Sequence, residues 1–308
     1  MKNRGLHRLS ITLAAMTLML LVAGALVTSN EAGDSVPDWP LSFGRWVINS
    51  NYFVANVRYE YSHRVIAFLV GATTLSLAVG AWPFRARPLI RRLTLVAFAG
   101  VVTQALIGGA RVSFPAYKPL IAIPHALVAQ SFFALSVALV VLTSDRWRET
   151  TPLNEDGRPS QARRLAILTM CAILAQASLG AGFRHGAFGV APHIVGAVAV
   201  SLAAVLTAVV ILRRYPSDAY LRRPALVLLV LLSCQVILGL LAYAARLGSY
   251  KDPQPLEPMI TLTVAHVVVG ALTLASAVVL AIRCPRTLTP AREKEGLRRL
   301  APYSISMT

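Results

Sequence analysis

Residues 190–212 read VAPHIVGAVAVSLAAVLTAVVIL and contain no charged side chain. A helix of about 20 such residues spans the hydrocarbon core of a bilayer. The chain contains seven other predominantly apolar stretches of this length, bounded by charged residues or by Pro and Gly. The sequence therefore predicts an all-α membrane protein with eight transmembrane helices, at residues 9–28, 59–83, 92–112, 120–143, 163–183, 190–212, 224–246 and 259–282.

The composition excludes a soluble protein and indicates the membrane topology. Of the 308 residues, 56% are hydrophobic and 14% are charged, whereas soluble domains carry about 25% charged residues. The net charge of +17 would suit nucleic-acid binding, but the basic residues lie in short runs between the apolar stretches. Positively charged loops stay on the cytoplasmic side of a membrane. Because 22 of the 30 Lys and Arg residues lie on the side of the two termini, we expect both termini in the cytoplasm.

A short motif recurs in three of the predicted helices. It reads TQALIG at residues 103–108, AQASLG at residues 175–180 and CQVILG at residues 234–239. Two other predicted helices, at residues 120–143 and 190–212, carry Pro-His near their start, at His125 and His193. We interpret these repeats as a duplication that gives two pseudo-symmetric four-helix bundles. The predicted units are an N-terminal half at 1–143, a cytoplasmic linker at 144–162, a C-terminal half at 163–283 and a cytoplasmic tail at 284–308.

Four of the six histidines lie inside predicted helices, one in each even-numbered span, a few residues from its outer end. At 1.5 Å rise per residue, they lie roughly 5–10 Å below the outer surface. An ionisable side chain inside a span is costly and marks a functional site. The other two histidines, His7 in the N-terminal tail and His185 in an outer loop, are expected to be solvated. The candidates are His63 and His125 in the first half, and His193 and His266 in the second.

Two imidazoles that face each other inside a four-helix bundle are an arrangement that binds haem iron from both sides. Zinc would bring Cys, Asp or Glu ligands, and the three cysteines of this chain are scattered. A single histidine bonded to a neighbouring helix would be merely structural, but four at matched positions favour haem. Haem propionates need cationic partners, unless the nearby arginines only extend towards the lipid headgroups. The candidate propionate partners are Arg64, Arg111, Arg184 and Arg246.

Glu60 distinguishes the two halves. It precedes His63 by three residues and shares its helical face, whereas the equivalent position in the second half is Val190. Only the first half therefore has an acid–base group beside a histidine. This asymmetry suits an enzyme that holds a redox cofactor in one half and a substrate in the other. The alternative is that Glu60 only pairs with Arg58 or Arg64.

The chain resembles the haem A synthase family from about residue 10 to residue 283. The resemblance rests on Glu60-Tyr61-Ser62-His63-Arg64, on Pro37-Asp38-Trp39-Pro40 in the first outer loop, and on the positions of the other three histidines. It implies a bacterial protein that crosses the cytoplasmic membrane several times, with its sites near the outer face. The implied reaction oxidises the methyl group at ring position 8 of haem O to a formyl group. A hydroxymethyl intermediate precedes the product, haem A, which terminal oxidases use.

The resemblance also implies a role for each candidate residue. His193 and His266 would ligate a permanent haem B, and His63 and His125 would hold the substrate haem O. Glu60 would act at the reacting methyl, as a proton acceptor or by stabilising positive charge. Besides membrane lipids, the implied partners are haem O synthase and an electron acceptor. A homo-oligomer is compatible with this assignment, and nucleic acid is not a partner.

The sequence departs from the family at one place, and two other functions remain open. Relatives often carry a cysteine pair around the Pro-Asp-Trp-Pro stretch, where this chain has Val36 and Ser42. This leaves any redox role of the loop in doubt. The first alternative function is a di-haem b-type electron carrier, which would use the same histidines but would not need Glu60. The second is a transporter with internal repeats, which would place polar sites at the membrane midplane.

Overall fold

The structure is a computed structural model that describes residues 4–83, 86–149, 151–152, 160–248, 256–284 and 286–287. This part of the chain is almost entirely helical. Two single-turn 3-10 helices, η1 and η2, and two short strands, β1 and β2, complete it. The elements are α1 (Arg4–Ser29), η1 (Ser50–Tyr52), α2 (Val57–Gly80), α3 (Pro88–Ser113), η2 (Pro115–Tyr117), α4 (Lys118–Thr143), α5 (Asp145–Glu149), β1 (Thr151–Pro152), α6 (Gln161–Arg184), α7 (Ala191–Arg214), α8 (Ala219–Gly248), α9 (Glu257–Arg283) and β2 (Arg286–Thr287).

The prediction of eight transmembrane helices is confirmed. Within the described residues, eight helices are long and apolar enough to cross a membrane, namely all α-helices except α5. Their ends differ from the predicted ends by about five residues at most, mainly because the helices continue past the apolar runs. His7 illustrates the difference, since it lies in α1 rather than in a solvated tail. Its Nδ1 lies 3.0 Å from the hydroxyl of Thr143, at the end of α4.

Helix α8 begins before Pro224, which the sequence had placed at its first turn. Asp218 accepts a hydrogen bond from the backbone N–H of Tyr220 at 2.8 Å, and the helix starts there. Pro224 therefore lies inside the helix, where its missing N–H leaves the Tyr220 carbonyl without its usual donor. Arg283 of α9 takes this place, with its Nη1 donating to the Tyr220 carbonyl at 3.2 Å.

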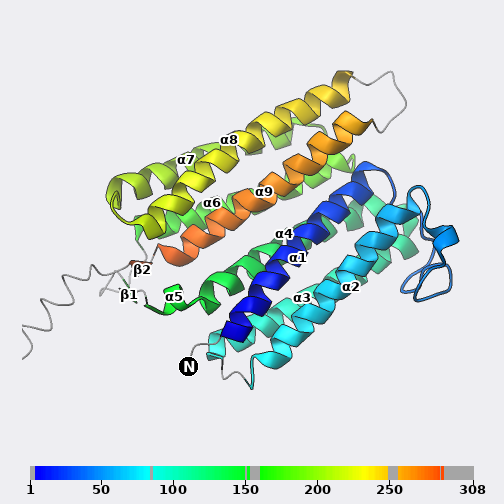
Figure 1. The fold of residues 1–308 in the computed structure, drawn as a ribbon. Helices are drawn as coiled ribbons and strands as arrows, with labels where there is room; N and C mark the ends of the chain where they lie inside the picture. The colour runs from blue at the N-terminus through cyan, green and yellow to red at the C-terminus, as the bar shows by residue number, and fades with distance from the viewer. Residues whose placement is uncertain are drawn as a thin grey trace, which may run out of the picture.

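The long helices form two groups with the same neighbour pattern. The groups are α1–α4 and α6–α9. Within each group every helix packs against the next one in the chain, and the last helix also packs against the first. Figure 1 shows the two groups side by side, with α1 and α9 adjacent. Helix α4 also contacts α6 and α9 across the boundary. The duplication of the chain stays a prediction, but this packing pattern is what it would produce.

The start of α1, the short helix α5 and the β1–β2 pair lie at one end of the bundle, and the connection from α1 to α2 lies at the other (Figure 1). The expectation from the distribution of Lys and Arg, that the first of these ends faces the cytoplasm, stays a prediction. In the strand pair, Thr151 opposes Thr287 and Pro152 opposes Arg286. Residues 150, 153–159, 285 and 288–308, which include most of the predicted linker and tail, lie outside the described part of the chain.

The bond from Arg283 to Tyr220 can be tested with Pro224. We expect Arg283→Leu to lower the free energy of unfolding by about 1–2 kcal/mol, since it removes a charged donor from a part-buried carbonyl. In a Pro224→Ala background the restored N–H can serve this carbonyl, so the same substitution should have a smaller effect. Thermal unfolding in detergent of the four variants measures the difference. Equal effects of Arg283→Leu in both backgrounds would show that the carbonyl does not depend on Arg283.

Candidate functional site

Each of the four predicted histidines packs against a glycine on the helix that precedes it. A Cβ atom built on these glycines would lie 2.9 to 3.3 Å from the imidazole Cε1. This is closer than the roughly 3.5–4.0 Å at which carbon atoms pack. The absence of a side chain is therefore what allows each ring to approach the neighbouring backbone. The pairs are His63 with Gly24, His125 with Gly108, His193 with Gly180 and His266 with Gly239.

The repeated motif of the sequence supplies three of these glycines, together with a glutamine one helical turn earlier. The Nε2 of Gln104 donates to the backbone carbonyl of His125 at 2.9 Å. The Nε2 of Gln176 likewise donates to the His193 carbonyl at 2.8 Å and also contacts the ring Nδ1 at 3.0 Å. The Nε2 of Gln235 contacts the ring Nε2 of His266 at 3.2 Å. Sequence reasoning found the repeat but not its role. Its spacing, a Gln four residues before a Gly, was the available signal.

The geometry of the C-terminal pair fits a metal ion between two imidazoles. The ring centres of His193 and His266 are 6.3 Å apart, and the ring planes are inclined by 75°. Metal–imidazole bonds of roughly 2 Å on both sides fit within this separation. No cluster of three or more His, Cys, Asp or Glu side chains suited to a metal occurs among the described residues. Two facing imidazoles are also the number of axial ligands that haem iron takes.

The N-terminal pair presents buried nitrogen atoms without partners. The Nδ1 atoms of His63 and His125 are buried and have no partner at ordinary hydrogen-bond distance, although the backbone of Leu20 lies close to the His63 ring. Buried polar atoms are nearly always bonded in folded proteins, so such exceptions mark a candidate ligand site. His63 and His125 also lie within electrostatic range of each other and of Arg111.

Glu60 lies next to this pair and is almost completely buried, with 5% of its surface exposed. One carboxylate oxygen accepts from the backbone N–H of Val36 at 2.9 Å and from the hydroxyl of Ser35 at 3.3 Å. The other oxygen forms an ion pair with Arg64 at 2.7 Å. Of the two arginine partners considered, the structure therefore pairs Glu60 with Arg64. The carboxylate is held in one position by donors from the loop and from α2.

Arg64 ties the first outer loop to α2. Its Nη1 donates to the carbonyls of Asp38 at 2.7 Å and Leu41 at 2.9 Å, and its Nη2 donates to the carbonyl of Val36 at 3.3 Å and to Glu60. Its donors are thus used by the protein itself. The assignment of Arg64 to a haem propionate stays a prediction, and this geometry does not favour it.

The positions where relatives carry cysteines contribute to the same network. Val36 is fully buried and its N–H binds Glu60. Ser42 is also buried, and its hydroxyl lies 3.4 Å from Nη1 of Arg64. A polar network centred on Arg64 therefore holds together the loop ends that a disulfide could join. In addition, the indole of Trp39 packs on Gly109 of α3, which brings the loop over the N-terminal site.

A tight turn closes the loop around Asp38. Its carboxylate oxygens accept from the backbone N–H groups of Phe43 and Gly44, each at 2.7 Å. Both of these residues have positive φ, 53° and 70°, a conformation that glycine adopts without strain. Burial alone would raise the pKa of Asp38, but the hydrogen bonds from Gly44 and Phe43 outweigh it and lower the pKa below 3.8.

The remaining candidate arginines lie at the ends of α3, α6 and α8 on the side of this loop. Arg184 donates to the carbonyl of Thr28 at 2.9 Å, and Arg246 lies over the ring of Phe183 at 4.8 Å. The Nε atom of Arg111 is buried without a hydrogen-bond partner. His185 was expected to be solvated, but it is half-buried at the C-terminal cap of α6. Burial, and secondly the charges of Arg111 and Arg184, lower its pKa to about 4.

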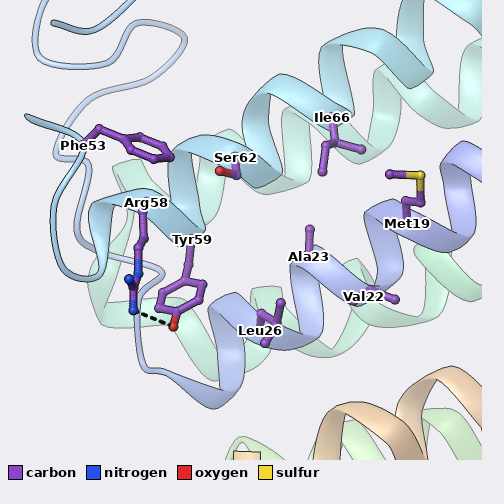
Figure 2. A pocket seen from close by; sticks show the side chains of 9 residues that line it. All are labelled: Met19, Val22, Ala23, Leu26, Phe53, Arg58, Tyr59, Ser62 and Ile66. Atoms are coloured by element: carbon purple, nitrogen blue, oxygen red, sulfur yellow. Dashed lines mark hydrogen bonds between the residues drawn. The ribbon is translucent and has the colours of Figure 1, made fainter. Parts of the chain in front are cut away.

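A pocket of about 430 Å³ lies between α1 and α2 beside the N-terminal site (Figure 2). Its lining is mainly apolar, and the Arg58 guanidinium donates to the hydroxyl of Tyr59 at one edge, at 3.0 Å. Ala23 and Ser62 line the pocket and are the sequence neighbours of Gly24 and His63. The pocket therefore lies at the same level along the two helices as the contact between this histidine and its glycine.

A search for related proteins identifies the family. The COX15-CtaA family, described as cytochrome oxidase assembly protein, matches residues 7–192, which is more than half of the chain. The chain belongs to this family. The matched region contains Glu60, His63 and His125 and ends one residue before His193. It is shorter than the extent expected from the sequence motifs.

Individual relatives support the same family. The heme A synthase of Alkalihalophilus pseudofirmus is 32% identical over 166 residues, 53% of this chain and 54% of the relative. That of Halalkalibacterium halodurans is 36% identical over 149 residues, 46% of this chain and 44% of the relative. That of Shouchella clausii is 30% identical over 152 residues, 49% of this chain and 48% of the relative. The chain thus spans about half the length of the curated relatives it matches.

The role of Arg64 in holding the loop leads to a first prediction for this site. Arg64→Ala should expose the backbone amides of the loop at residues 36–44 to exchange, since it removes several charge-assisted hydrogen bonds that together contribute about 2–3 kcal/mol. We expect amide hydrogen exchange in this segment to become roughly 30- to 150-fold faster. Arg58→Ala is the matched control, because Arg58 is exposed and contacts only Tyr59 among the described interactions. Similar exchange in both variants would contradict the role of Arg64.

The lowered pKa of Asp38 predicts how the turn depends on pH. A carboxyl group with a lowered pKa stabilises the folded form above its unfolded value of 3.8, and this contribution is lost as the pH falls through the folded pKa. Protection of the Phe43 and Gly44 amides should therefore be constant near neutral pH and should fall below pH 3.8. Asp38→Asn should remove this step. A pH-independent protection in the unaltered protein would refute the turn's dependence on the carboxylate.

Proposed function

We propose that the protein is a haem A synthase that oxidises the ring-position-8 methyl of haem O to a formyl group through a hydroxymethyl intermediate. One observation carries this proposal: a buried carboxylate, Glu60, is fixed one helical turn before His63 on α2, whereas Val190 stands one turn before His193. A protein that only transfers electrons would not need this difference. Membership of the family and the names of the relatives support it.

In this proposal the two histidine pairs have different tasks. His193 and His266 hold a haem B, which when bound supplies electron transfer. His63 and His125 hold haem O, which is the substrate, and their unpartnered Nδ1 atoms are consistent with a site that binds a further group. Arg184 and Arg246 would bind the propionates of the cofactor, and Arg111 those of the substrate.

Glu60 would accept a proton at the reacting methyl group or stabilise the positive charge that develops there. Its ion pair with Arg64 and its bond to the Val36 N–H keep the carboxylate in place during the reaction. The loop around Trp39, which packs over α3, would exclude water from the outer side. The protein's own contribution is thus to position the substrate and one carboxylate.

The proposed setting is the cytoplasmic membrane of a bacterium, with both sites near the outer face. The proposed partners are a haem O synthase that supplies the substrate and an acceptor that takes the electrons. A homo-oligomer is compatible with this setting.

The test combines product analysis with one substitution. The protein is purified from cells that also make haem O, and the extracted pigments are separated by chromatography with mass detection. We expect haem B together with haem O, its hydroxymethyl derivative or haem A. Glu60→Gln should keep the haems bound but lower formyl production by roughly 10²- to 10⁴-fold, the usual contribution of a general base. Glu257→Gln, at the first turn of α9, is the control.

Each outcome distinguishes the functions considered. Unchanged haem A output from the Glu60 variant would refute the synthase assignment. Haem B in both sites, with haem O available and Glu60 dispensable, would identify a di-haem b-type electron carrier. The absence of any haem would refute both.

A further inference from the structure

The first outer loop has a buried side and an exposed side. On the buried side, Arg64 binds the carbonyls of the loop and holds it against α2. The backbones of Ser42 and Arg45 exchange two hydrogen bonds, at 2.9 and 3.1 Å, which close the turn on this side. The residues that follow, 45–54, form the loop tip and are mostly exposed.

The loop tip presents large apolar side chains to its surroundings. Trp46 is 77% exposed and Val47 is 75% exposed, and the side chains of Tyr52, Phe53 and Val54 are exposed as well. Single exposed apolar residues are common on protein surfaces, whereas a contiguous apolar surface marks contact with another protein or with a membrane. The loop tip is therefore a candidate interaction surface.

Hydrogen bonds and ring stacking give the loop tip a defined shape. The side chain of Asn49 accepts a hydrogen bond from the backbone N–H of Asn51 at 3.4 Å, which starts the 3-10 helix η1. The rings of Phe43 and Tyr52 are stacked, with their centres 4.6 Å apart. The apolar side chains thus project from an ordered segment that could hold them against a surface.

Phe53 connects the loop tip with the flank of the membrane-spanning helices. Its ring lies edge-on to that of Tyr61, one helical turn into α2, with 6.4 Å between the ring centres. It also lines the pocket between α1 and α2, together with Met19 and Ile66 (Figure 2). Ile66 lies nine residues beyond the start of α2, which is roughly 13 Å along the helix. The apolar surface of the loop tip therefore continues into the lipid-facing surface of the bundle.

The connection between α3 and α4 adds aromatic side chains at the same end of the bundle. Helix α3 ends where α2 begins (Figure 1). Next to its end, Phe114 is 57% exposed and Tyr117 of η2 is 59% exposed. Aromatic residues, above all Trp and Tyr, gather where a membrane meets water. These side chains and the loop tip together have the composition of such an interfacial belt.

The charges of the loop suit lipid headgroups. Residues 36–56 contain one acidic residue, Asp38, and one basic residue, Arg45. The carboxylate of Asp38 is bound by the turn, whereas Arg45 is exposed next to Trp46. An arginine can lay its stem on an apolar surface while its charge stays among the headgroups. Charge, composition and continuity with α2 all favour lipid as the partner of the loop tip.

We propose that the loop tip is inserted into the headgroup region of the bilayer at this end of the bundle. The first outer loop is then fixed to α2 by Arg64 on one side and to lipid by Trp46, Val47, Phe53 and Val54 on the other. The partner is the membrane surface itself. This inference goes beyond the proposed function and does not depend on it, because no haem takes part in the contact.

Spin labels report the depth of the loop tip in a bilayer. Cys171, Cys234 and Cys284 are replaced by Ala, a single nitroxide is attached at Val47→Cys or Val54→Cys, and the protein is placed in nanodiscs of phosphatidylcholine and phosphatidylglycerol. Oxygen concentrates in hydrocarbon and a nickel chelate stays in water, so their relative effects on the label give its depth. We expect both labels within about 5–10 Å of the boundary between headgroups and acyl chains, where interfacial segments lie.

Two reference positions calibrate this measurement. Phe68→Cys, on the exposed face of α2, should give a label that is accessible to oxygen and shielded from nickel. Asn51→Cys, at an exposed polar position of η1, should give a label that is more accessible to nickel than those at positions 47 and 54. Thermal unfolding in detergent establishes that the cysteine-free protein is folded like the unaltered one.

A second pair of variants tests whether the apolar side chains cause the insertion. Trp46→Gln combined with Val47→Gln should raise the nickel accessibility of a label at position 54, because the loop tip loses its apolar contact with lipid. Asn51→Gln exchanges one polar side chain for another at the same loop tip and should leave this label unchanged.

Quenching of tryptophan fluorescence gives an independent measurement without cysteine removal. The emission that is lost in Trp46→Tyr is the contribution of Trp46 to the unaltered protein. This contribution should be quenched by phosphatidylcholine brominated near the headgroup more strongly than by iodide in water.

The outcomes decide between lipid, water and protein as the surroundings of the loop tip. Labels at positions 47 and 54 that are as accessible to nickel as the label at position 51 would overturn the proposal. Labels shielded from both oxygen and nickel would indicate a protein contact, such as a second copy of the chain, and would overturn it as well. Quenching of Trp46 by iodide and not by brominated lipid would have the same meaning.

Discussion

The close approach of an imidazole to a glycine on the neighbouring helix is the contact on which the arrangement of this bundle depends. It occurs in four helix pairs, α1 with α2, α3 with α4, α6 with α7 and α8 with α9. In a bilayer no hydrophobic force drives helices together, so close packing at small residues and interhelical hydrogen bonds must do so. The glycines provide the first in all four pairs, and Gln104, Gln176 and Gln235 provide the second in three of them.

Side chains of the candidate site also hold the first outer loop against helix α2. Glu60 and Arg64 are one turn apart on α2, and together they bind residues of the loop from Ser35 to Ser42. A buried charge is tolerated inside an apolar region only when it is paired and hydrogen-bonded. The loop supplies the partners that Glu60 and Arg64 require, and these two residues in turn fix the loop. The position of the candidate catalytic carboxylate is therefore inseparable from the covering of the site.

The sequence was sufficient to predict the helices, because apolar length alone decides whether a segment can span a bilayer. It also pointed to the four histidines and Glu60 as candidate site residues, since ionisable residues inside apolar stretches are conspicuous, and their roles stay predictions. The role of Gly24 or Gly180 was not predictable, because a glycine in an apolar run carries no sign of what approaches it from another helix. The hydrogen bonds from Arg64 to the loop could not be predicted either, because backbone carbonyl acceptors have no sequence signature. The start of α8 was misplaced because Pro224 suits a first turn, and only the contact with Arg283 shows how it is accommodated inside the helix.

Two nearly equivalent four-helix groups raise the question of how one scaffold can serve two purposes. The helices, the glycines and the imidazoles are repeated, so the backbone cannot be the source of the difference. The differences lie in small changes beside a common framework: a carboxylate in one half, and in the other a pair of glycines, Gly196 and Gly270, that admit two amides to the rings. Under the proposed function, the carboxylate belongs to the half that would hold the substrate, and the two amides belong to the half that would hold the cofactor.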